Sequence, residues 1–298
     1  MSLFRRRKLK QESAVCYAIM GILAAICVLP VLLTFSASVT SEAYIQKHGY
    51  SLIPREFTLD TYEFLFKSKL NVLLRAFWMS FKVVILGTIT SVTITTCFAY
   101  AVTQKKKMFR FARPLSFIAW FTSVFGGGVL PWYILCTRYY GLRDNIFALF
   151  IPSCFSVWNM FIIRGSFREI PGELIESAKL DGASEFRIFW NIAIPLARSG
   201  IVTVGLFSIL GYWNDAYLPL WLIRSSDYYT AQKLLYDMMA RMDILLSGAN
   251  TQAVQHIVTP TNTAKMAVTV MTILPIMLFY PLGLKYFVKG INLGGVKG

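Results

Sequence analysis

The sequence lacks the short motifs by which many catalytic and nucleotide-binding proteins are recognised. Its glycine runs are not followed by the lysine of a phosphate-binding loop, and neither GxSxG nor HExxH occurs. The five cysteines form no CxxC pair and show no metal-ligand spacing, and His48 and His256 are far apart in the chain. We therefore predict no catalytic residue, no metal site and no cofactor held by this chain, and we expect the cysteines to be buried structural thiols.

Acidic residues are also scarce. The chain has 15 Asp and Glu against 30 Lys and Arg, which gives a formal net charge of +15. Asp215 is the only carboxylate well inside a long apolar run, so the intramembrane acid and base pairs of proton-driven carriers are nearly absent. Active transport by this chain would need energy from another protein. Nucleic-acid binding is the alternative use of such a positive charge, and the placement of the charges disfavours it.

Apolar sequence, in contrast, is abundant. Hydrophobic residues make up 56% of the 298 residues and charged residues 15%, and the mean hydropathy is +0.54, which is typical of polytopic membrane proteins. A bilayer core of about 30 Å needs roughly 20 mostly apolar residues per helix. We predict an all-α membrane protein with six transmembrane helices, and two of them are interrupted, by "FGGGVLP" and "YWND". The predicted spans are residues 14–37, 83–103, 115–137, 146–164, 201–223 and 266–288.

Basic residues cluster in alternate connections between these runs. Lys and Arg resist translocation across an energised membrane, so their positions indicate the cytoplasmic side. Both termini are therefore expected in the cytoplasm, and the connections 38–82 and 224–265 are expected outside. The basic clusters are "RRRKLK" before the first run, "KKKMFRFAR" between the second and third, Arg168, Lys179, Arg187 and Arg198 between the fourth and fifth, and three lysines at the end.

The first apolar run has a second interpretation, as a cleaved signal peptide. A basic stretch precedes it, and "SAS" at residues 36–38 resembles a cleavage site. The run is longer than the usual signal core of about 7 to 15 residues. We therefore expect it to be the first membrane span.

The segment of residues 170–200, rich in charge and small side chains, joins the fourth and fifth runs. Pro171 can occupy the first turn of a helix, and "PGELIESAKL" then runs to Gly182, where a flexible residue can turn the chain. Ser184 can cap a second helix, "SEFRIFWNIAI", which Pro195 ends. The segment is predicted to form two short helices joined by a turn.

The first of these two helices presents two kinds of surface. Glu173, Glu176 and Leu180 follow one another at spacings i, i+3 and i+7, so both carboxylates lie on one face. Ser177 and Ala178 keep the neighbouring surface low enough for close docking. From the residues alone, two interpretations stay open: a solvated loop that fixes topology, and a docking surface for a partner.

The motif "ESAKLDGAS", followed by "IAIPLA", resembles the EAA loop of the membrane subunits, or permeases, of ATP-binding cassette (ABC) importers. Ser177 and Ile194 depart from the family pattern, which has Ala and Leu there. In that family the loop docks on a cytoplasmic ATPase, which binds the ATP and Mg. The resemblance implies a type I ABC importer permease fold and coupling to an ATPase through Glu173, Glu176, Ser177, Ala178, Asp181, Gly182 and Pro195.

Three further stretches resemble the carbohydrate permeases of this family, the type similar to the second maltose permease subunit. They are "YWNDAYLPLWLI", "LGGVKG" at the end, and "GGGVLPWYILCTRYYGL", which is similar to the polysaccharide or lipoprotein permease C subgroup. The resemblance implies that the tail, with Gly294, Gly295 and Lys297, inserts between the ATPases, and its small residues suit a narrow gap. A frayed terminus is the alternative.

Polar and aromatic side chains recur at similar depths in three of the predicted spans. Aromatic faces stack on the C–H surfaces of sugars, and amide and hydroxyl groups satisfy sugar hydroxyls without charge. Interfacial belts and bonds between helices are the alternative for each residue. Five threonines between residues 88 and 96 could also line a path, although we expect local bonds to backbone carbonyls. The candidate path residues are Trp132, Tyr133, Trp158, Asn159, Tyr212, Trp213, Asn214 and Tyr217.

The resemblance divides the chain into a basic N-terminus (1–13), a transmembrane permease domain (14–288) and a C-terminal tail (289–298). It predicts a non-catalytic permease subunit of a carbohydrate importer in the bacterial cytoplasmic membrane. The implied partners are a second homologous permease, an ATPase dimer, a substrate-binding protein and membrane lipid. A self-sufficient facilitator or channel is the rival hypothesis, and a membrane-bound enzyme is the third. The amphipathic stretch "AQKLLYDMMARMDILL" packs on the chain itself or contacts the binding protein.

Overall fold

The protein is helical, in agreement with the predicted all-α class. The structure is a computed structural model that describes residues 2–104, 109–247 and 262–294. Its β-structure within these ranges is one isolated antiparallel bridge, between Thr40 and Phe57. The chain forms two compact units, Met1–Leu70 with Asp237–Leu274, and Asn71–Tyr236 with Pro275–Gly298, and each is described by itself.

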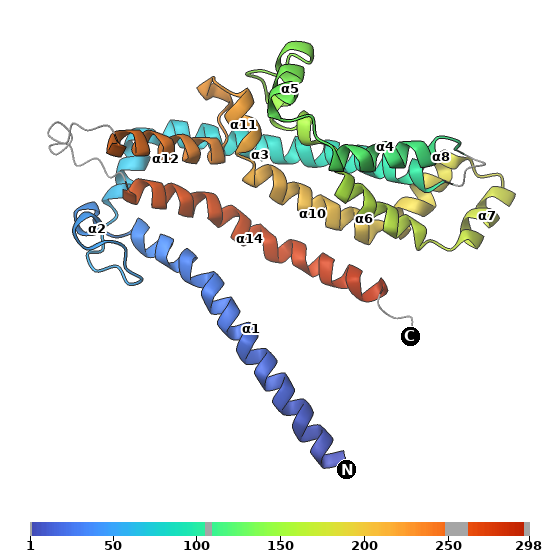
Figure 1. The fold of residues 1–298 in the computed structure, drawn as a ribbon, viewed down its shortest axis with the longest axis horizontal. Coiled ribbons are helices and arrows are strands. Elements are labelled where there is room, and N and C mark those ends of the chain that lie inside the picture. The colour runs from blue at the N-terminus through green and yellow to red at the C-terminus, as the bar shows by residue number, and fades with distance from the viewer. Residues whose placement is uncertain (1, 105–108, 248–261, 295–298) are drawn as a thin grey trace. The chain divides into compact units, whose positions relative to one another are not determined.

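Long helices alternate with short segments along the chain (Figure 1). The short segments are the π-helices η1 (Leu135–Tyr139) and η4 (Phe189–Ala193) and the 3-10 helices η2 (Ile146–Leu149), η3 (Ile151–Ser153) and η5 (Ser226–Tyr228). The α-helices are α1 (Ser2–Ser38), α2 (Glu42–His48), α3 (Asp60–Thr103), α4 (Ala112–Val124), α5 (Val129–Ile134), α6 (Val157–Arg168), α7 (Gly172–Leu180), α8 (Glu185–Ile188), α9 (Ile194–Leu196), α10 (Arg198–Asn214), α11 (Tyr217–Leu222), α12 (Ala231–Ser247) and α14 (Asn262–Gly294).

Two helices are long and apolar enough to cross a membrane alone, at Cys16–Ser38 and Leu70–Thr103. Three bent helix pairs pass the same test of length and composition, which makes up to five spans, and α14 begins with the shorter apolar stretch Asn262–Leu278. The predicted apolar runs therefore fall on helical structure. Six spans and cytoplasmic termini stay predictions.

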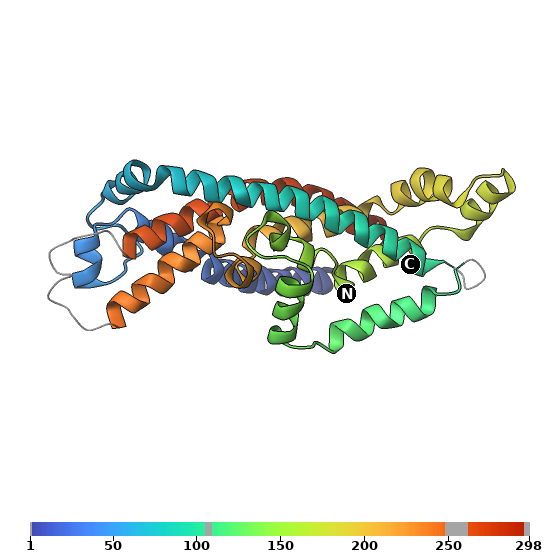
Figure 2. The same ribbon diagram turned by 90° about the horizontal axis from the view of Figure 1, so that it is seen from above.

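The third and fifth predicted spans are broken where the sequence is interrupted. Residues 125–128 separate α4 from the helical stretch Val129–Tyr139, and the chain bends there by 116° (Figure 2). Gly128 has a φ of +85°, a conformation that glycine adopts without strain. Between α10 and α11, the Asp215 Oδ1 accepts hydrogen bonds from the N–H groups of Tyr217 (2.8 Å) and Leu218 (3.2 Å), so a new helix begins.

The fourth predicted span, residues 146–164, falls on a bent pair of helical segments rather than on one continuous helix. The chain forms the short helices η2 and η3 and then α6, with a bend of 57° between the two parts. The Oδ1 of Asn145 caps the first part by accepting from the N–H of Ala148 (2.9 Å). Ser156 caps α6 in the same way, accepting from the N–H of Asn159 (3.4 Å). Two separate caps thus start two helices in a run that hydropathy alone treats as continuous.

In the first unit, a carboxylate joins the segment after α1 to the start of α14. The Glu42 side chain accepts hydrogen bonds from the backbone N–H of Asn262 (3.2 Å) and Thr263 (2.9 Å). It also accepts from the Asn262 Nδ2 (3.0 Å) and the Thr263 Oγ1 (2.9 Å). An acidic group satisfies the free N–H groups of a helix start and is favoured by the helix dipole. Glu42 is therefore buried without an energetic conflict.

In the second unit, α6 and α10 lie side by side (Figure 1). Met160 and Ile163 of α6 and Val204 of α10 are fully buried in one apolar cluster. The two helices approach closely at Gly200, where a Cβ would lie 2.2 Å from the Oγ of Ser166. Small residues at such a crossing allow membrane helices to pack backbone to backbone.

The expectation of buried cysteines is wrong for three of the five. Cys136 is buried and Cys154 is partly buried, whereas Cys16, Cys27 and Cys97 are exposed on the chain surface. A thiol is apolar enough to lie on the outer face of a membrane helix. No group of potential metal ligands occurs among the described residues.

The expected local bonding of the threonines in α3 also fails in part. The hydroxyls of Thr88, Thr95 and Thr96 are buried and have no hydrogen-bond partner among the described residues. These side chains pack like small apolar groups in the interior of the helix bundle.

Candidate transport pocket and coupling segment

The second unit contains a cavity of about 440 Å³ between its helices. Residues of α3, α5, α6, α10 and α11 contribute to its wall, together with the 3-10 helix η3. Both helix interruptions, at residues 125–128 and 215–216, lie next to elements that line it. The lining residues are Ser91, Trp132, Pro152, Ser153, Asn159, Phe207, Ser208, Gly211, Tyr212, Asp215, Tyr217 and Leu218.

Aromatic rings form one part of this wall. The rings of Trp132 and Tyr217 lie 5.5 Å apart between centroids. Tyr212 is 7% exposed, and its hydroxyl donates to the backbone carbonyl of Phe150 at 3.3 Å, which fixes the ring. Rigid aromatic faces in a cavity are suited to flat apolar surfaces such as the C–H face of a sugar ring.

Hydroxyl, amide and carboxylate groups form the polar part. The Oγ of Ser208 donates to the Oγ of Ser91 at 3.5 Å across the contact of α10 with α3. Asn159 adds an amide to the wall, and Ser153 adds a hydroxyl. Asp215 is the acidic residue among the lining residues, and its Oδ1 is already engaged in capping α11. The cavity therefore offers aromatic faces together with hydroxyl and amide groups and one carboxylate.

Four of the predicted path residues line this cavity: Trp132, Asn159, Tyr212 and Tyr217. The placement of Trp132 and Tyr217 depends on the helix breaks, because α5 and α11 are the short helices that follow those breaks. A path role for each of the four stays a prediction.

The structure places the other four predicted path residues elsewhere. Trp213 is 5% exposed and packs in the core, with its ring 5.2 Å from that of Phe81, because it points away from the cavity-facing side of α10. Trp158 is 72% exposed and Tyr133 packs near Trp221 at 6.3 Å between ring centroids. The Nδ2 of Asn214 donates to the carbonyl of Leu210 at 3.0 Å, within its own helix.

Sequence reasoning missed the serines and the phenylalanine of the wall. Ser91, Ser208 and Phe207 lie in long apolar helices, where each looks like an isolated small or core residue. Their alignment comes from the packing of α3 against α10, which is a tertiary property. A search for hydroxyls buried in apolar runs would have selected Ser91 and Ser208, together with several threonines.

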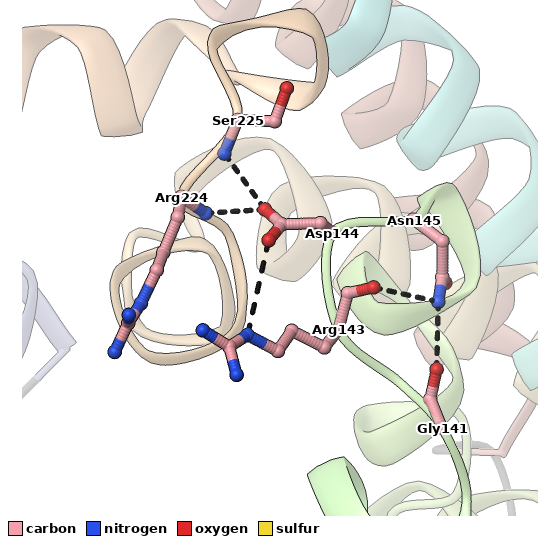
Figure 3. Close-up of polar contacts among 6 residues, drawn as sticks. All are labelled: Gly141, Arg143, Asp144, Asn145, Arg224 and Ser225. Carbon is pink, nitrogen blue, oxygen red and sulfur yellow. Dashed lines mark hydrogen bonds and ion pairs between the residues drawn. The ribbon is translucent and has the colours of Figure 1, made fainter.

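A carboxylate in the loop before η2 holds the end of α11 in place (Figure 3). The Oδ1 of Asp144 accepts from the backbone N–H groups of Arg224 (2.6 Å) and Ser225 (2.8 Å). Asp144 has a φ of +50°, and its own N–H donates to the carbonyl of Leu222 at 3.1 Å. Because Tyr217 and Leu218 of α11 line the cavity, Asp144 fixes the helix that carries this part of the wall.

The acid sensitivity of this contact can be predicted. The N–H groups of Ser225 and Arg224, aided by the charges of Arg143 and Arg224, hold the pKa of the Asp144 carboxyl below its usual value. Because the pKa of this carboxyl is lower in the folded state, its charge stabilises the fold at pH values above the unfolded-state pKa of about 4. This stabilisation is lost as the pH falls through the folded-state pKa. We expect Asp144→Asn to cost about 2 kcal/mol at pH 7 and less as the pH is lowered below about 4, measured by thermal unfolding in detergent.

The matched control for Asp144 is the neighbouring residue Arg143. Its Nε lies 3.9 Å from the Asp144 Oδ2, and both side chains are partly exposed. An ion pair of this kind is worth under about 1 kcal/mol, so Arg143→Gln should change stability little at either pH. If Asp144→Asn were less stable than the wild type by the same amount at low pH, the charge of Asp144 would not be the source of the stabilisation.

The segment of residues 170–200 forms the predicted two helices with a turn. Helix α7 ends in a Schellman motif, in which the N–H of Ala183 donates to the carbonyl of Ala178 (2.9 Å) and that of Gly182 to Lys179 (3.0 Å). Gly182 has a φ of +76°, as the predicted turn requires. The Oγ of Ser184 accepts from the N–H of Arg187 at 3.3 Å and caps α8.

The two prolines of this segment occupy helix positions that differ slightly from the predicted ones. Pro171 is the N-cap residue of α7 rather than part of its first turn. Pro195 lies inside the short helix α9 and does not end the second helix, which continues through η4 and bends by 76° after Leu196. A proline at the first or second position of a helical turn is compatible with that turn, because its missing N–H needs no partner.

Helix α7 is a surface element without a buried residue. Glu173, Glu176 and Ser177 are exposed and Ala178 is half-buried, while Asp181 and Gly182 are exposed at the turn. Apolar side chains are exposed beside them, with Leu180 at 89%. The Nζ of Lys179 lies 2.9 Å from the Glu185 Oε1 and ties α7 to α8. Gly294 ends α14, whereas Gly295 and Lys297 lie outside the described residues.

A broken-helix bundle with a wall of aromatic and polar groups and an exposed helical hairpin of charged and small residues defines a membrane transport subunit. The chain belongs to the family of binding-protein-dependent transport system inner membrane components, whose sequence pattern matches residues 10–293. It is thus a multi-pass protein of the bacterial cell membrane and a component of a transport system that includes a substrate-binding protein.

Two curated relatives match over nearly their whole length. Protein LplC of Bacillus subtilis is 34% identical over 279 residues, covering 94% of this chain and 92% of the relative. The polygalacturonan/rhamnogalacturonan transport system permease protein YtcP of Bacillus subtilis is 32% identical, covering 95% and 96%.

A solved structure is also similar. It is a chain of a bacterial ABC transporter involved in the import of the acidic polysaccharide alginate, with a TM-score of 0.78 and 26% identity. The similarity covers 92% of this chain and 96% of the other. The predicted ABC importer permease fold is confirmed.

Proposed function

We propose that this chain is the translocation subunit of an ATP-driven importer for carbohydrate, most simply an oligosaccharide. The cavity of about 440 Å³ carries this proposal, because neighbouring aromatic rings and hydroxyl and amide groups share one wall. The names of its relatives support the same class of substrate, since they include permeases for polygalacturonan and for arabinooligosaccharides.

The chain supplies half of the translocation path and one contact with the ATPase that drives transport. Helix α7 and its Schellman turn form the surface that docks on a cytoplasmic ATPase, where ATP and Mg are bound. Exposed Leu180, next to the acidic Glu173 and Glu176, gives this surface both apolar and charged groups. One chain offers one such element and an ATPase dimer offers two clefts, so a second, homologous permease completes the assembly.

Co-purification and reconstitution test the class of transporter. A related permease and an ATPase should purify with the tagged chain in mild detergent, and oligosaccharide uptake into proteoliposomes should require ATP and the binding protein. Flux of sugar through the chain alone, without ATP, would instead identify a facilitator.

A pair of adjacent residues tests the cavity. Asn159 lines it, whereas Trp158 is exposed outside it. We expect Asn159→Ala to lower uptake up to about tenfold, the effect of one or two lost hydrogen bonds, with basal ATP hydrolysis unchanged. Trp158→Ala should retain uptake at matched membrane levels. Equal losses of uptake and of assembled complex in Asn159→Ala would make that residue a packing residue.

A further inference from the structure

A second cavity, of about 370 Å³, lies between α4 and α6. Arg113, Ser116, Phe117 and Trp120 of α4 and Phe161 and Arg164 of α6 line it. None of these residues lines the transport pocket. The two arginines are far apart in sequence and are brought together by the packing of α4 on α6.

The positive charge in this cavity is not balanced by the protein. Its lining includes no Asp or Glu. The Arg164 Nη1 donates to the Ser116 Oγ at 2.8 Å, but its Nε is buried without a partner among the described residues. A guanidinium in a membrane helix is costly unless an anion or an acceptor satisfies it. The site can therefore accept an external anion, with Arg113 exposed at its opening.

Polar and apolar groups are ordered along both helices. Arg113 is in the first turn of α4, Ser116 one turn further on, and Trp120 another turn further. On α6 the arginine lies toward the C-terminal end, with Arg164 in the last turns. Phe161 lies nearly one turn closer to the helix centre. The charges thus lie at the helix ends and the rings lie toward the helix centres.

This order of charged and apolar groups matches the order of headgroup and acyl chain in a phospholipid. Arg113 is the last residue of the basic stretch "KKKMFRFAR", and Arg164 lies just before the segment 170–200, the two regions expected at the cytoplasmic surface. Phe117 and Trp120 are 60% and 45% exposed, so an acyl chain can lie along their rings.

We propose that the cavity between α4 and α6 binds the phosphate of an anionic phospholipid from the cytoplasmic leaflet. Arg113, Arg164 and Ser116 hold the phosphate oxygens, because guanidinium groups match phosphate in geometry and charge. Phe117, Trp120 and Phe161 contact the first part of an acyl chain. Basic pockets between membrane helices on the cytoplasmic side are suited to such headgroups.

The full chain, purified in mild detergent, tests this site by thermal stabilisation during titration with phosphatidylglycerol or phosphatidylcholine. Phosphatidylglycerol should stabilise the wild type at lower concentration. Combined Arg113→Gln and Arg164→Gln should weaken the affinity for phosphatidylglycerol about thirtyfold, since both guanidinium groups that would hold the phosphate directly are lost. The matched control, Arg110→Gln with Arg168→Gln, removes two exposed charges that do not line the cavity and should keep the affinity within about twofold.

Four results would overturn the proposal. Equal weakening in the control pair would indicate general surface charge, and equal stabilisation by phosphatidylcholine would indicate an apolar groove. Equal stabilisation by inorganic phosphate would indicate an ion site without a lipid. Unchanged lipid affinity in the Arg113 and Arg164 variant, with loss of uptake of an acidic oligosaccharide, would assign the arginines to the transport path.

Discussion

Substitution of Gly182 by valine is expected to abolish coupled uptake while leaving the chain in the membrane. Gly182 has a φ of +76° and provides the left-handed turn between α7 and α8. A β-branched side chain disfavours this conformation strongly, so the turn would open and α8 would leave α7 in a different direction. A docking element transmits motion only if its geometry is fixed. We expect uptake below about a tenth of the wild-type rate, and ATP hydrolysis no longer stimulated by sugar and binding protein.

Two control variants separate conformation from side-chain bulk. Gly172→Val places the same side chain at the start of α7, where φ is not positive and nothing lies within 4 Å. Gly182→Asn keeps a residue that tolerates positive φ. Both should retain most uptake at equal membrane levels. Normal stimulated hydrolysis in Gly182→Val would mean that the segment is only a solvated loop.

Local chemistry explains which parts of this segment could be predicted from the sequence. Gly182 and Ser184 act through bonds to backbone groups three to five residues away, so short-range spacing is sufficient to identify the turn and the cap. The same reasoning located the breaks at residues 125–128 and at Asp215, because glycines and a capping carboxylate interrupt helices wherever they lie.

Two features were missed, one because hydropathy hid local caps and one because it depends on tertiary packing. The hydropathy of residues 146–164 is that of a single span, and the bend depends on the caps at Asn145 and Ser156, which compete with a continuous helix. The adjacent residues Tyr212 and Trp213 look equally suited to a path, yet one lines the cavity and the other is in the core. The direction of a side chain on a helix that is apolar all round is set by its neighbours.

Substitution of Gly87 by alanine is expected to impair transport through the cavity wall, although alanine favours helices. A Cβ at Gly87 in α3 would lie 2.8 Å from two ring atoms of Tyr212 and 2.9 Å from a third. The ring cannot easily move, because it is buried and its hydroxyl is bonded to the Phe150 carbonyl. Overpacking of this kind costs about 1 to 3 kcal/mol. We expect a lower melting temperature and uptake reduced about tenfold or more, with basal ATP hydrolysis retained.

Gly205 in α10 is the matched control for this substitution, because a Cβ there meets its nearest atom, Val92 Cγ2, at 3.9 Å. Gly205→Ala should therefore keep uptake and raise stability by up to about 1 kcal/mol, the difference in helix propensity. A loss of stability in Gly87→Ala and a gain in Gly205→Ala would show that the effect arises from the contact with Tyr212. The same response in both variants would show that the α3 approach to Tyr212 does not shape the cavity.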